Sequence, residues 1–325
     1  MAYATAKEVA LDAIPVIDIA PLFDGVEGER HVGRQLLESV QKIGFFYIEN
    51  HGIPQAKIDS VLETGARFFH APREQKGTVR IADYHRGFLP VGEAKMSGAR
   101  KPDYKESYIW GWDVAANDPD IENSKRILAP NRWPTFQPDL RTVLDDYIET
   151  VNGLGVHLLR AFAAGLELPH DHFVQHFDKP LTRAAVVYYP PQPEDMGESQ
   201  FGVSPHTDYG CVTILYQDTI GGLQVQDRNG EWLKAPPVPG TFVVNVGDLL
   251  HRWSNNRFIS NPHRVVNTSG QERFSIPVFI DPNWDTVIDP VVEAGGKTRH
   301  APIGCAEYIH EIYQRSFAYR NEDAT

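Results

Sequence analysis

Apolar residues recur at helical spacing along the first half of the chain, which favours helices there. Residues 139–165 carry the longest such stripe, and its members lie three and four positions apart: Leu140, Val143, Leu144, Tyr147, Ile148, Val151, Leu154 and Leu158. Two shorter helices are expected over residues 27–42 and 55–70. Short apolar segments at 14–22 and 44–52, each ended by a proline or a glycine, are expected to be strands.

After residue 180 the pattern changes to short segments rich in β-branched and aromatic residues, separated by turn residues. These segments are "RAAVVYY", "CVTILYQ", "GLQVQD", "EWLKAP", "TFVVNVG", "HRVVN" and "RFSIPVFI". Asn229-Gly230 is expected to be a two-residue hairpin turn. So many short strands close together indicate a sandwich or a jelly roll. The absence of an internal repeat or a flexible linker favours one compact body, with the helices packed around a β core.

Charge and composition exclude several classes of protein. The 325 residues carry a formal net charge of −12 without a basic run, which argues against nucleic acid as a partner. The first twenty residues have charges where a signal peptide needs an apolar stretch, and no apolar run has transmembrane length. The two cysteines, Cys211 and Cys305, form no disulfide framework. A cytoplasmic protein without a membrane partner is therefore expected.

The stretch "SPHTDYG" places His206 and Asp208 two positions apart beside a strand-like run. Side chains alternate along a strand, so both would project from the same face and could share a metal ion. A hydrogen-bonded histidine and aspartate at a strand edge is the simpler alternative. A third ligand would favour the metal.

Thirteen histidines could supply that ligand. The two in "LPHDHF" read as part of a loop that opens a helix, and His251 in "GDLLHRWSN" could reach a pocket. His263 in "NPHRVVN" begins a strand well beyond Asp208, which suits a ligand arriving from another part of a barrel. Two imidazoles and one carboxylate form the facial triad that holds non-haem Fe(II) and leaves positions open for oxygen chemistry.

Downstream, "RFSIPVF" puts Arg273 and Ser275 on one face of a predicted strand. A guanidinium fork and a hydroxyl in that arrangement could hold one carboxylate inside a barrel. Taken alone, this pair would be interpreted as a surface arginine next to a serine on a strand. Together with the H-x-D and H-R-V segments, the R-x-S segment makes a chance coincidence improbable.

With these motifs the chain resembles the iron and 2-oxoglutarate dependent oxygenases of the isopenicillin N synthase type, over nearly its whole length. The shared segments include "IPVIDIAPL", "GFFYIENHGI", "DYKESY", "VVYYPPQP", "PHTDYG", "NPHRVVN" and "RFSIPVF". The resemblance implies a mainly β core with flanking helices, built as a double-stranded β-helix (jelly roll). It divides the chain into an N-terminal α/β region (1–125), supporting helices (126–179), the oxygenase core (180–283) and a C-terminal helix and tail (284–325).

The same resemblance implies the roles of the site residues. The iron ligands would be His206, Asp208 and His263, with no catalytic side chain beyond the metal centre. The anchor of 2-oxoglutarate would be Arg273 and Ser275, with Tyr189 touching co-substrate or substrate. One departure is Val187, where many relatives carry asparagine.

An enzyme of this family uses Fe(II), 2-oxoglutarate and O2, with ascorbate as a candidate reductant, and releases succinate and CO2. Hydroxylation, desaturation and ring closure of the substrate all remain open. One alternative is an oxidase of the same fold that uses Fe(II) and O2 without 2-oxoglutarate. A non-catalytic ligand-binding jelly roll is the other.

By analogy with the family, the roof of the substrate pocket would come from Arg86, Phe88, Tyr104, Lys105 and Tyr108, with Phe279 on the barrel side. Aromatic residues more often fill a core, and Lys105 with Glu106 could be a surface pair. The expected partner is a small organic substrate. The expected oligomeric state is a monomer or a weak homo-oligomer.

Overall fold

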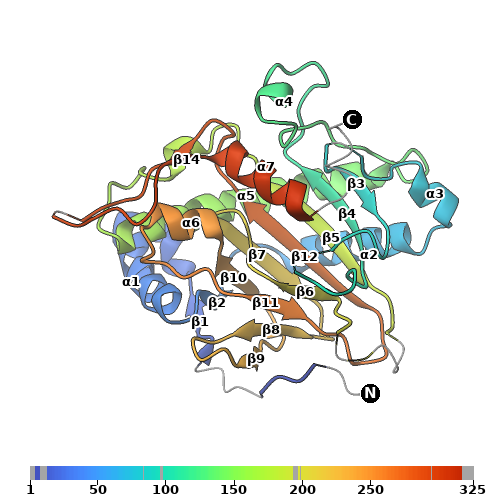
Figure 1. Cartoon of the computed structure of the whole chain (residues 1–325), viewed down its shortest axis with the longest axis horizontal. Helices are drawn as coiled ribbons and strands as arrows, with labels where there is room; N and C mark the ends of the chain where they lie inside the picture. The colour runs from blue at the N-terminus through green and yellow to red at the C-terminus, as the bar shows by residue number, and fades with distance from the viewer. Residues whose placement is uncertain are drawn as a thin grey trace.

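The computed structural model describes residues 4–7, 13–82, 84–95, 98–192, 197, 199–293 and 295–316. Two β-sheets lie at the centre of this part of the chain, with helices packed outside them (Figure 1). The fold is a mainly β core with flanking helices, as predicted.

In the described residues the larger sheet has eight strands in the order β1-β2-β10-β7-β12-β5-β4-β3. Along the chain these are β1 (Val16–Asp18), β2 (Phe45–Glu49), β3 (Gly87–Leu89), β4 (Glu106–Gly111), β5 (Arg183–Tyr189), β7 (Val212–Gln217), β10 (Phe242–Val246) and β12 (Arg273–Ile280). Most neighbours pair antiparallel, and β1 pairs with β2 in parallel. This sheet supplies one wall of the interior.

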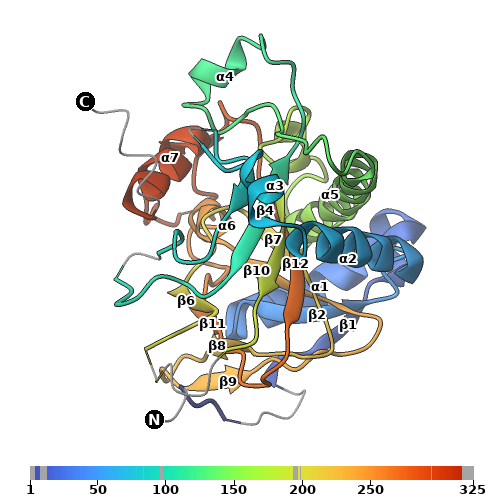
Figure 2. The same cartoon turned by 90° about the vertical axis from the view of Figure 1, so that its right-hand side faces the viewer.

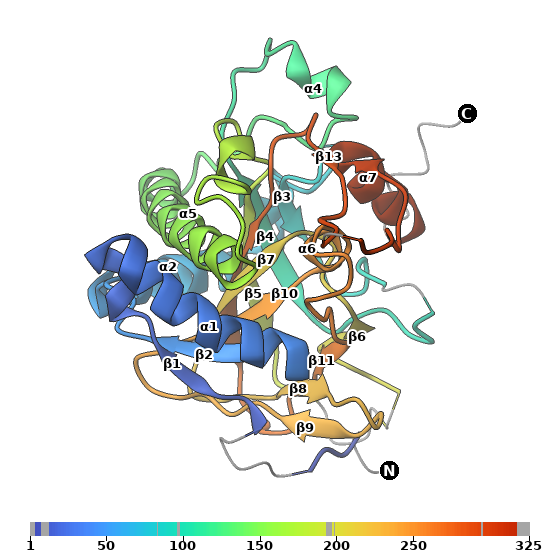
Figure 3. The ribbon, with the colours of Figure 1, turned by 90° about the vertical axis from the view of Figure 1, so that its left-hand side faces the viewer.

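Four strands of the described chain form the smaller sheet, in the order β6-β11-β8-β9. These are β6 (Val203–His206), β8 (Leu223–Gln226), β9 (Trp232–Lys234) and β11 (His263–Val265). A separate pair joins β13 (Val287–Ile288) to β14 (Ile303–Gly304). In Figures 2 and 3 the smaller sheet lies at the opposite end of the molecule from the short helix α4 (Asp120–Asn123).

Three long helices cover the outer face of the larger sheet: α1 (Val26–Lys42), α2 (Gln55–Phe69) and α5 (Asp139–Gly165). Figure 3 shows them together on one side, with α7 (Cys305–Ser316) on the other. The shorter helices are η2 (Ala20–Asp24), α3 (Arg73–Gly77), η3 (Val174–His176) and α6 (Asp248–Trp253). The apolar stripe of α5 is buried against α1, α2 and β12, so this predicted helix is confirmed at the predicted bounds.

Alternation along β12 separates the helix-facing side from the interior. Ile276, Val278 and Ile280 are fully buried, and Ile280 lies where a Cβ on Gly155 of α5 would clash. The residues between them point the other way, into the space between the two sheets. The strand therefore packs against the helical layer with one face, and its other face presents Arg273, Ser275, Pro277 and Phe279 to the interior.

The close packing of α1 on α5 yields a stability prediction. A Cβ built on Gly33 of α1 would lie 2.4 Å from the carbonyl oxygen of Ala161, which is backbone and cannot move aside easily. We expect Gly33→Ala to lower the free energy of unfolding by about 1–3 kcal/mol, the usual cost of overpacking. Chemical denaturation followed by circular dichroism would measure it.

Gly153 on α5 is the matched control, because it is exposed and no atom lies within 4 Å of its built Cβ. Gly153→Ala should raise the free energy of unfolding by about 0.5–1 kcal/mol, since alanine is the better helix former. Equal effects at the two positions would contradict the packing argument.

Several local predictions need correction. The segment 14–22 is a strand only at Val16–Asp18 and then turns into the 3-10 helix Ala20–Asp24, because Pro21 provides no amide for a sheet. The strands β3 and β4 and the helix α6 were not predicted. All are short, so each shows too few periods for its pattern to be recognised.

The predicted two-residue turn at Asn229-Gly230 is wrong, although the hairpin between β8 and β9 exists. The amide of Asp227 donates to the carbonyl of Glu231, so three residues form the loop between them. The Asp227 carboxylate accepts the amides of Asn229 and Glu231, and Gly230 adopts a φ of 81°. An aspartate that caps the turn from within stabilises the longer loop.

No helix of the described residues is long and apolar enough to cross a membrane.

Candidate functional site

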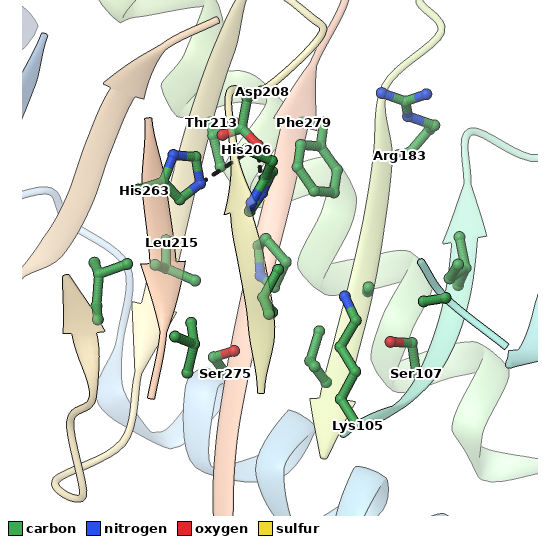
Figure 4. A pocket seen from close by; sticks show the side chains of 18 of the residues that line it. Lys105, Ser107, Arg183, His206, Asp208, Thr213, Leu215, His263, Ser275 and Phe279 are labelled. Atoms are coloured by element: carbon green, nitrogen blue, oxygen red, sulfur yellow. Dashed lines mark hydrogen bonds and ion pairs between the residues drawn. The ribbon is translucent and has the colours of Figure 1, made fainter. Parts of the chain in front are cut away.

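An open cavity lies between the two sheets (Figure 4). It contains about 1100 Å³ of space including its mouth. Alternate residues of β12 and of β5 face it from the larger sheet: Arg273, Ser275, Pro277 and Phe279, and Arg183, Ala185, Val187 and Tyr189. Residues of the other strands of the larger sheet, of the smaller sheet, of α7 and of nearby loops complete the lining. The strand periodicity thus gathers several polar groups in one place.

His206 and His263 meet because β6 and β11 pair antiparallel with these two residues opposite each other. Their ring centroids are 4.2 Å apart. Oδ1 of Asp208 lies 3.7 Å from Nε2 of each imidazole, and Figure 4 shows the three side chains converging. The three potential ligand atoms, one from each side chain, lie within 4.8 Å of one another, which is close enough for one metal ion to contact all of them.

The predicted reason for this proximity is wrong in one respect. Strand β6 ends at His206, so Asp208 lies beyond the strand and no strand alternation places it. The chain turns there, and the backbone carbonyl of Asp208 accepts the amide of Asp248 at the start of α6. The helix start therefore fixes the loop that carries the carboxylate.

Hydrogen bonds orient the side chains of Asp208 and His206. Oδ2 of Asp208 accepts the hydroxyl of Thr213 at 2.5 Å and the amide of Asn245 at 2.7 Å, which leaves Oδ1 facing the imidazoles. Nδ1 of His206 lies 2.9 Å from the carbonyl of Ser204. A carbonyl can only accept, so Nδ1 carries the proton and the lone pair of Nε2 points into the cluster.

Burial determines the charge state of the cluster. It lowers the pKa of His206 to about 3, and the neighbouring His263 adds to this effect. Burial alone would raise the pKa of Asp208, but the two imidazoles and the hydrogen bonds from Asn245 and Thr213 outweigh it and lower that pKa below its ordinary value. A neutral imidazole at His206 beside the Asp208 carboxylate is the protonation state that a divalent cation requires.

The rival histidines have other contacts. Nδ1 of His251 in α6 lies 2.6 Å from the carbonyl of Phe258, and His172 packs against the rings of Phe173 and Trp253. Within the described ranges, His206, Asp208 and His263 are the only three histidine, cysteine or acidic residues grouped tightly enough for one metal.

Arg273 is fully buried on the cavity side of β12. Its Nε donates to the carbonyl of Gly221, and its guanidinium lies 4.5 Å from the ring centroid of Tyr189. Neither Nη1 nor Nη2 has a hydrogen-bond partner in the described part of the chain. A buried, unpaired guanidinium fork is costly, and a bound carboxylate would satisfy it.

Ser275 and Val187 lie beside this fork. The Ser275 hydroxyl is 3.5 Å from the hydroxyl of Tyr189, and both residues line the cavity. Val187 lines it too and pairs with Ser275 across β5 and β12. Val187, the departure from the family pattern expected from the sequence, therefore presents methyl groups to the cavity.

Most of the roof residues predicted by analogy do not line the cavity. Arg86 is buried behind β4, donates to the carbonyls of His85 and Ile127, and occupies the space that a Cβ on Gly111 would need. Phe88 and Tyr108 pack edge-on against Phe68 in the core. These substrate assignments are corrected because each side chain fills or braces the interior.

Tyr104 also lies outside the lining, and its backbone amide donates to the carbonyl of Phe201. Phe279 and Lys105 do line the cavity. Glu106 forms an ion pair with Lys76 at 2.6 Å, so the surface pair between Lys105 and Glu106 is wrong.

The sequence reading missed other cavity residues. Thr213 and Asn245 are polar residues inside the apolar runs "CVTILY" and "FVVNV", which was the available signal for a buried polar role. Arg183 lines the cavity, and its Nη2 lies 2.9 Å from Oδ2 of the buried Asp281. Its Nη1 donates to the hydroxyl of Tyr313 on α7.

Comparisons with known proteins agree with this geometry. The 2OG-Fe(II) oxygenase superfamily matches residues 170–282, and the family described as non-haem dioxygenase in morphine synthesis N-terminal matches residues 14–136. The chain is 33% identical to the 2-oxoglutarate-Fe(II) type oxidoreductase hxnY of Emericella nidulans, over 97% of this chain and 94% of that protein. It is 30% identical to a 1-aminocyclopropane-1-carboxylate oxidase of Dictyostelium discoideum, over 86% and 84%.

Among solved structures, that of a full-length Neurospora crassa protein in complex with alpha-KG is similar. The TM-score is 0.81 at 30% identity, over 94% of this chain and 98% of that one. The complex of the same Neurospora crassa protein with alpha-KG and thymine gives a TM-score of 0.81 at 29% identity, with the same coverage.

Proposed function

The chain belongs to the 2OG-Fe(II) oxygenase superfamily, and from this premise we propose that its His-Asp-His cluster holds Fe(II) and that Arg273 anchors 2-oxoglutarate. One observation carries the proposal. The three converging ligand atoms and the buried unpaired guanidinium face the same cavity. Either feature alone is compatible with a purely structural role, but together they suit a metal and a dicarboxylate that bind side by side.

When bound, Fe(II) with 2-oxoglutarate and O2 supplies the oxidising chemistry, which releases succinate and CO2 and oxidises the substrate. The chain's own residues bind and orient. Thr213 and Asn245 aim one oxygen of Asp208 at the cluster, and the apolar side chains of Leu215, Leu223 and Val265 line the cavity around it. An apolar lining keeps water away from the reacting groups.

The co-substrate anchor follows from the fork geometry. The distal carboxylate of 2-oxoglutarate would accept two hydrogen bonds from Nη1 and Nη2 of Arg273 and one from the hydroxyl of Ser275. The bond from Nε to Gly221 and the stacking on Tyr189 hold the guanidinium plane in place. A fork fixed before the ligand arrives loses little entropy on binding.

We expect Thr213→Val to weaken Fe(II) binding by about ten- to a hundredfold, the usual cost of losing a partner of a metal ligand. The change keeps the side-chain shape but removes the donor that holds Oδ2 of Asp208 at 2.5 Å. Competition with a chelator would measure the metal affinity. Thr241→Val is the matched control, because its hydroxyl donates to Val238 away from the cavity. Equal affinities in all three proteins would contradict the orienting role.

The proposed substrate is a small organic molecule. The end of the cavity away from Arg273, further along β12 and β5, carries the ring of Phe279, the guanidinium of Arg183 and Tyr313 of α7. The Neurospora crassa complex with thymine supports a small planar substrate for a fold of this shape. The experiment is to measure Fe(II)- and O2-dependent succinate formation from 2-oxoglutarate against a library of metabolites.

We also propose that the chain acts without nucleic acid, as a monomer or weak homo-oligomer in the cytoplasm. The net charge of −12 supports the first part of this proposal, since phosphate contacts need clustered basic residues. Tight binding of DNA at physiological salt would contradict it.

A further inference from the structure

Two serines face the cavity at the same level on either side of β5. In the register of the larger sheet, Ser107 of β4 pairs with Val187 of β5, and Val187 pairs with Ser275 of β12. All three line the cavity. Ser275 belongs to the proposed anchor of 2-oxoglutarate, and Ser107 occupies the equivalent position two strands away.

Two cationic side chains show the same arrangement on either side of β5, each two residues before its serine. Arg273 pairs with Tyr189 of β5, and Lys105 precedes β4 by one residue, two positions before Ser107. Figure 4 shows Lys105 and Ser107 directed into the cavity. The chain thus presents a cation and a serine in the order K-x-S on one side of β5 and R-x-S on the other.

The Lys105 ammonium has no ion-pair partner among the described residues. Glu106 pairs with Lys76. Asp103 does not line the cavity, and its Oδ1 accepts the amide of Ser204. Burial raises the pKa of Asp103 and the charge of Lys105 opposes that rise, so Asp103 is near Lys105 without being paired with it.

The other cations that line the cavity already have counter-charges once co-substrate and metal are bound. Arg183 is paired with the buried Asp281. The charges of Fe(II), Asp208, Arg273 and the 2-oxoglutarate dianion cancel one another. Among the described lining residues Lys105 is therefore the remaining positive charge, and an anionic substrate would balance it.

We propose that Lys105 and Ser107 form a second carboxylate-binding subsite and that the substrate of this oxygenase is a small carboxylic acid. The inference rests on the function proposed above. Two strand spacings separate the subsites, which is roughly 10 Å. The methyl groups of Val187 lie between them, so the two anions would be held apart by an apolar wall.

Binding without turnover tests this directly. The protein would be loaded with Mn(II) and 2-oxoglutarate, then titrated calorimetrically with benzoate, phenylacetate and hexanoate at millimolar concentration, each against its own primary amide. We expect at least one acid to bind more tightly than its amide. Lys105→Met should lower the affinity for that acid about ten- to a hundredfold, which corresponds to the loss of one hydrogen bond to a charged group. Lys105→Arg should restore most of the affinity for the acid. Ser107→Ala should reduce that affinity less than Lys105→Met does.

Lys42→Met is the matched control, because Lys42 is exposed on α1 and pairs with Glu38. Acids that bind no better than their amides, or equally well to Lys105→Met, would overturn the inference. So would a weaker affinity of Lys105→Met for 2-oxoglutarate itself, since Lys105 would then serve the co-substrate. Failure of the wild type to bind 2-oxoglutarate would instead contradict the proposed function, so the two failures are distinguishable.

Discussion

Asp208→Ala is expected to give a folded protein that holds no Fe(II) and does not consume 2-oxoglutarate. Oδ1 of Asp208 faces Nε2 of both His206 and His263 at 3.7 Å, so its loss leaves the two imidazoles without an anionic ligand beside them. Losing a hydrogen-bond partner of a ligand costs up to about a hundredfold in affinity or activity, and losing the ligand should cost more. Metal analysis of the purified variant and succinate formation would measure the two effects.

The fold should survive this change. Thr213 and Asn245 each lose one acceptor, while the core around them remains apolar. His251→Ala provides the control, because His251 contacts the Phe258 carbonyl and should be dispensable for iron. If His251→Ala lost its iron, the ligand set would have to include residues other than the three proposed. Undiminished turnover by Asp208→Ala, with no carboxylate added, would do the same.

Long periodic segments were predictable from the sequence because each repeats its pattern many times. Helix α5 offers eight apolar positions on one stripe, and β5 and β12 match their predicted segments residue for residue. Strand β4 was missed although it carries Ser107. Its run "ESYIWG" is buried on both faces and shows no alternation, so periodicity could not identify it.

The candidate metal centre was predictable by residue type but not by its local geometry. H-x-D named His206 and Asp208, yet the strand ends between them. Oδ1 of Asp208 faces the imidazoles because the start of α6 holds the loop and because Thr213 and Asn245 donate hydrogen bonds to Oδ2. Most of these contacts join segments that are far apart in the sequence. Such contacts leave only the weak signal of a polar residue in an apolar run.

The substrate wall was the least predictable part. Arg86 and Tyr108 are polar or aromatic residues near the expected roof, but their side chains satisfy backbone carbonyls and fill the core. Arg183 was expected only as one residue of a strand, and in the structure it lines the cavity and forms an ion pair with the buried Asp281. The direction of a side chain depends on register, which tertiary pairing sets.

The guanidinium of Arg273 offers a test that separates 2-oxoglutarate chemistry from an oxidase of the same fold. It is buried, its plane is held by Gly221 and Tyr189, and both Nη atoms lack a partner in the part of the chain described. If a carboxylate of 2-oxoglutarate fills this place, removing the guanidinium leaves that carboxylate desolvated and unpaired. An uncompensated buried charge is among the costliest defects in a binding site.

We therefore expect Arg273→Leu to weaken the binding of 2-oxoglutarate by about 2–5 kcal/mol, which lowers the affinity tens-fold to thousands-fold. Iron content should stay unchanged, because Arg273 is no part of the His-Asp-His cluster. Arg273→Lys should be intermediate, since an ammonium keeps the charge but loses the fork. Calorimetry with Mn(II)-loaded protein and the Michaelis constant for 2-oxoglutarate would both report the change. Val187 supplies no amide beside the fork, so Arg273 and Ser275 carry the anchoring together. Wild-type turnover that releases oxidised product without succinate would show that the guanidinium serves another anion.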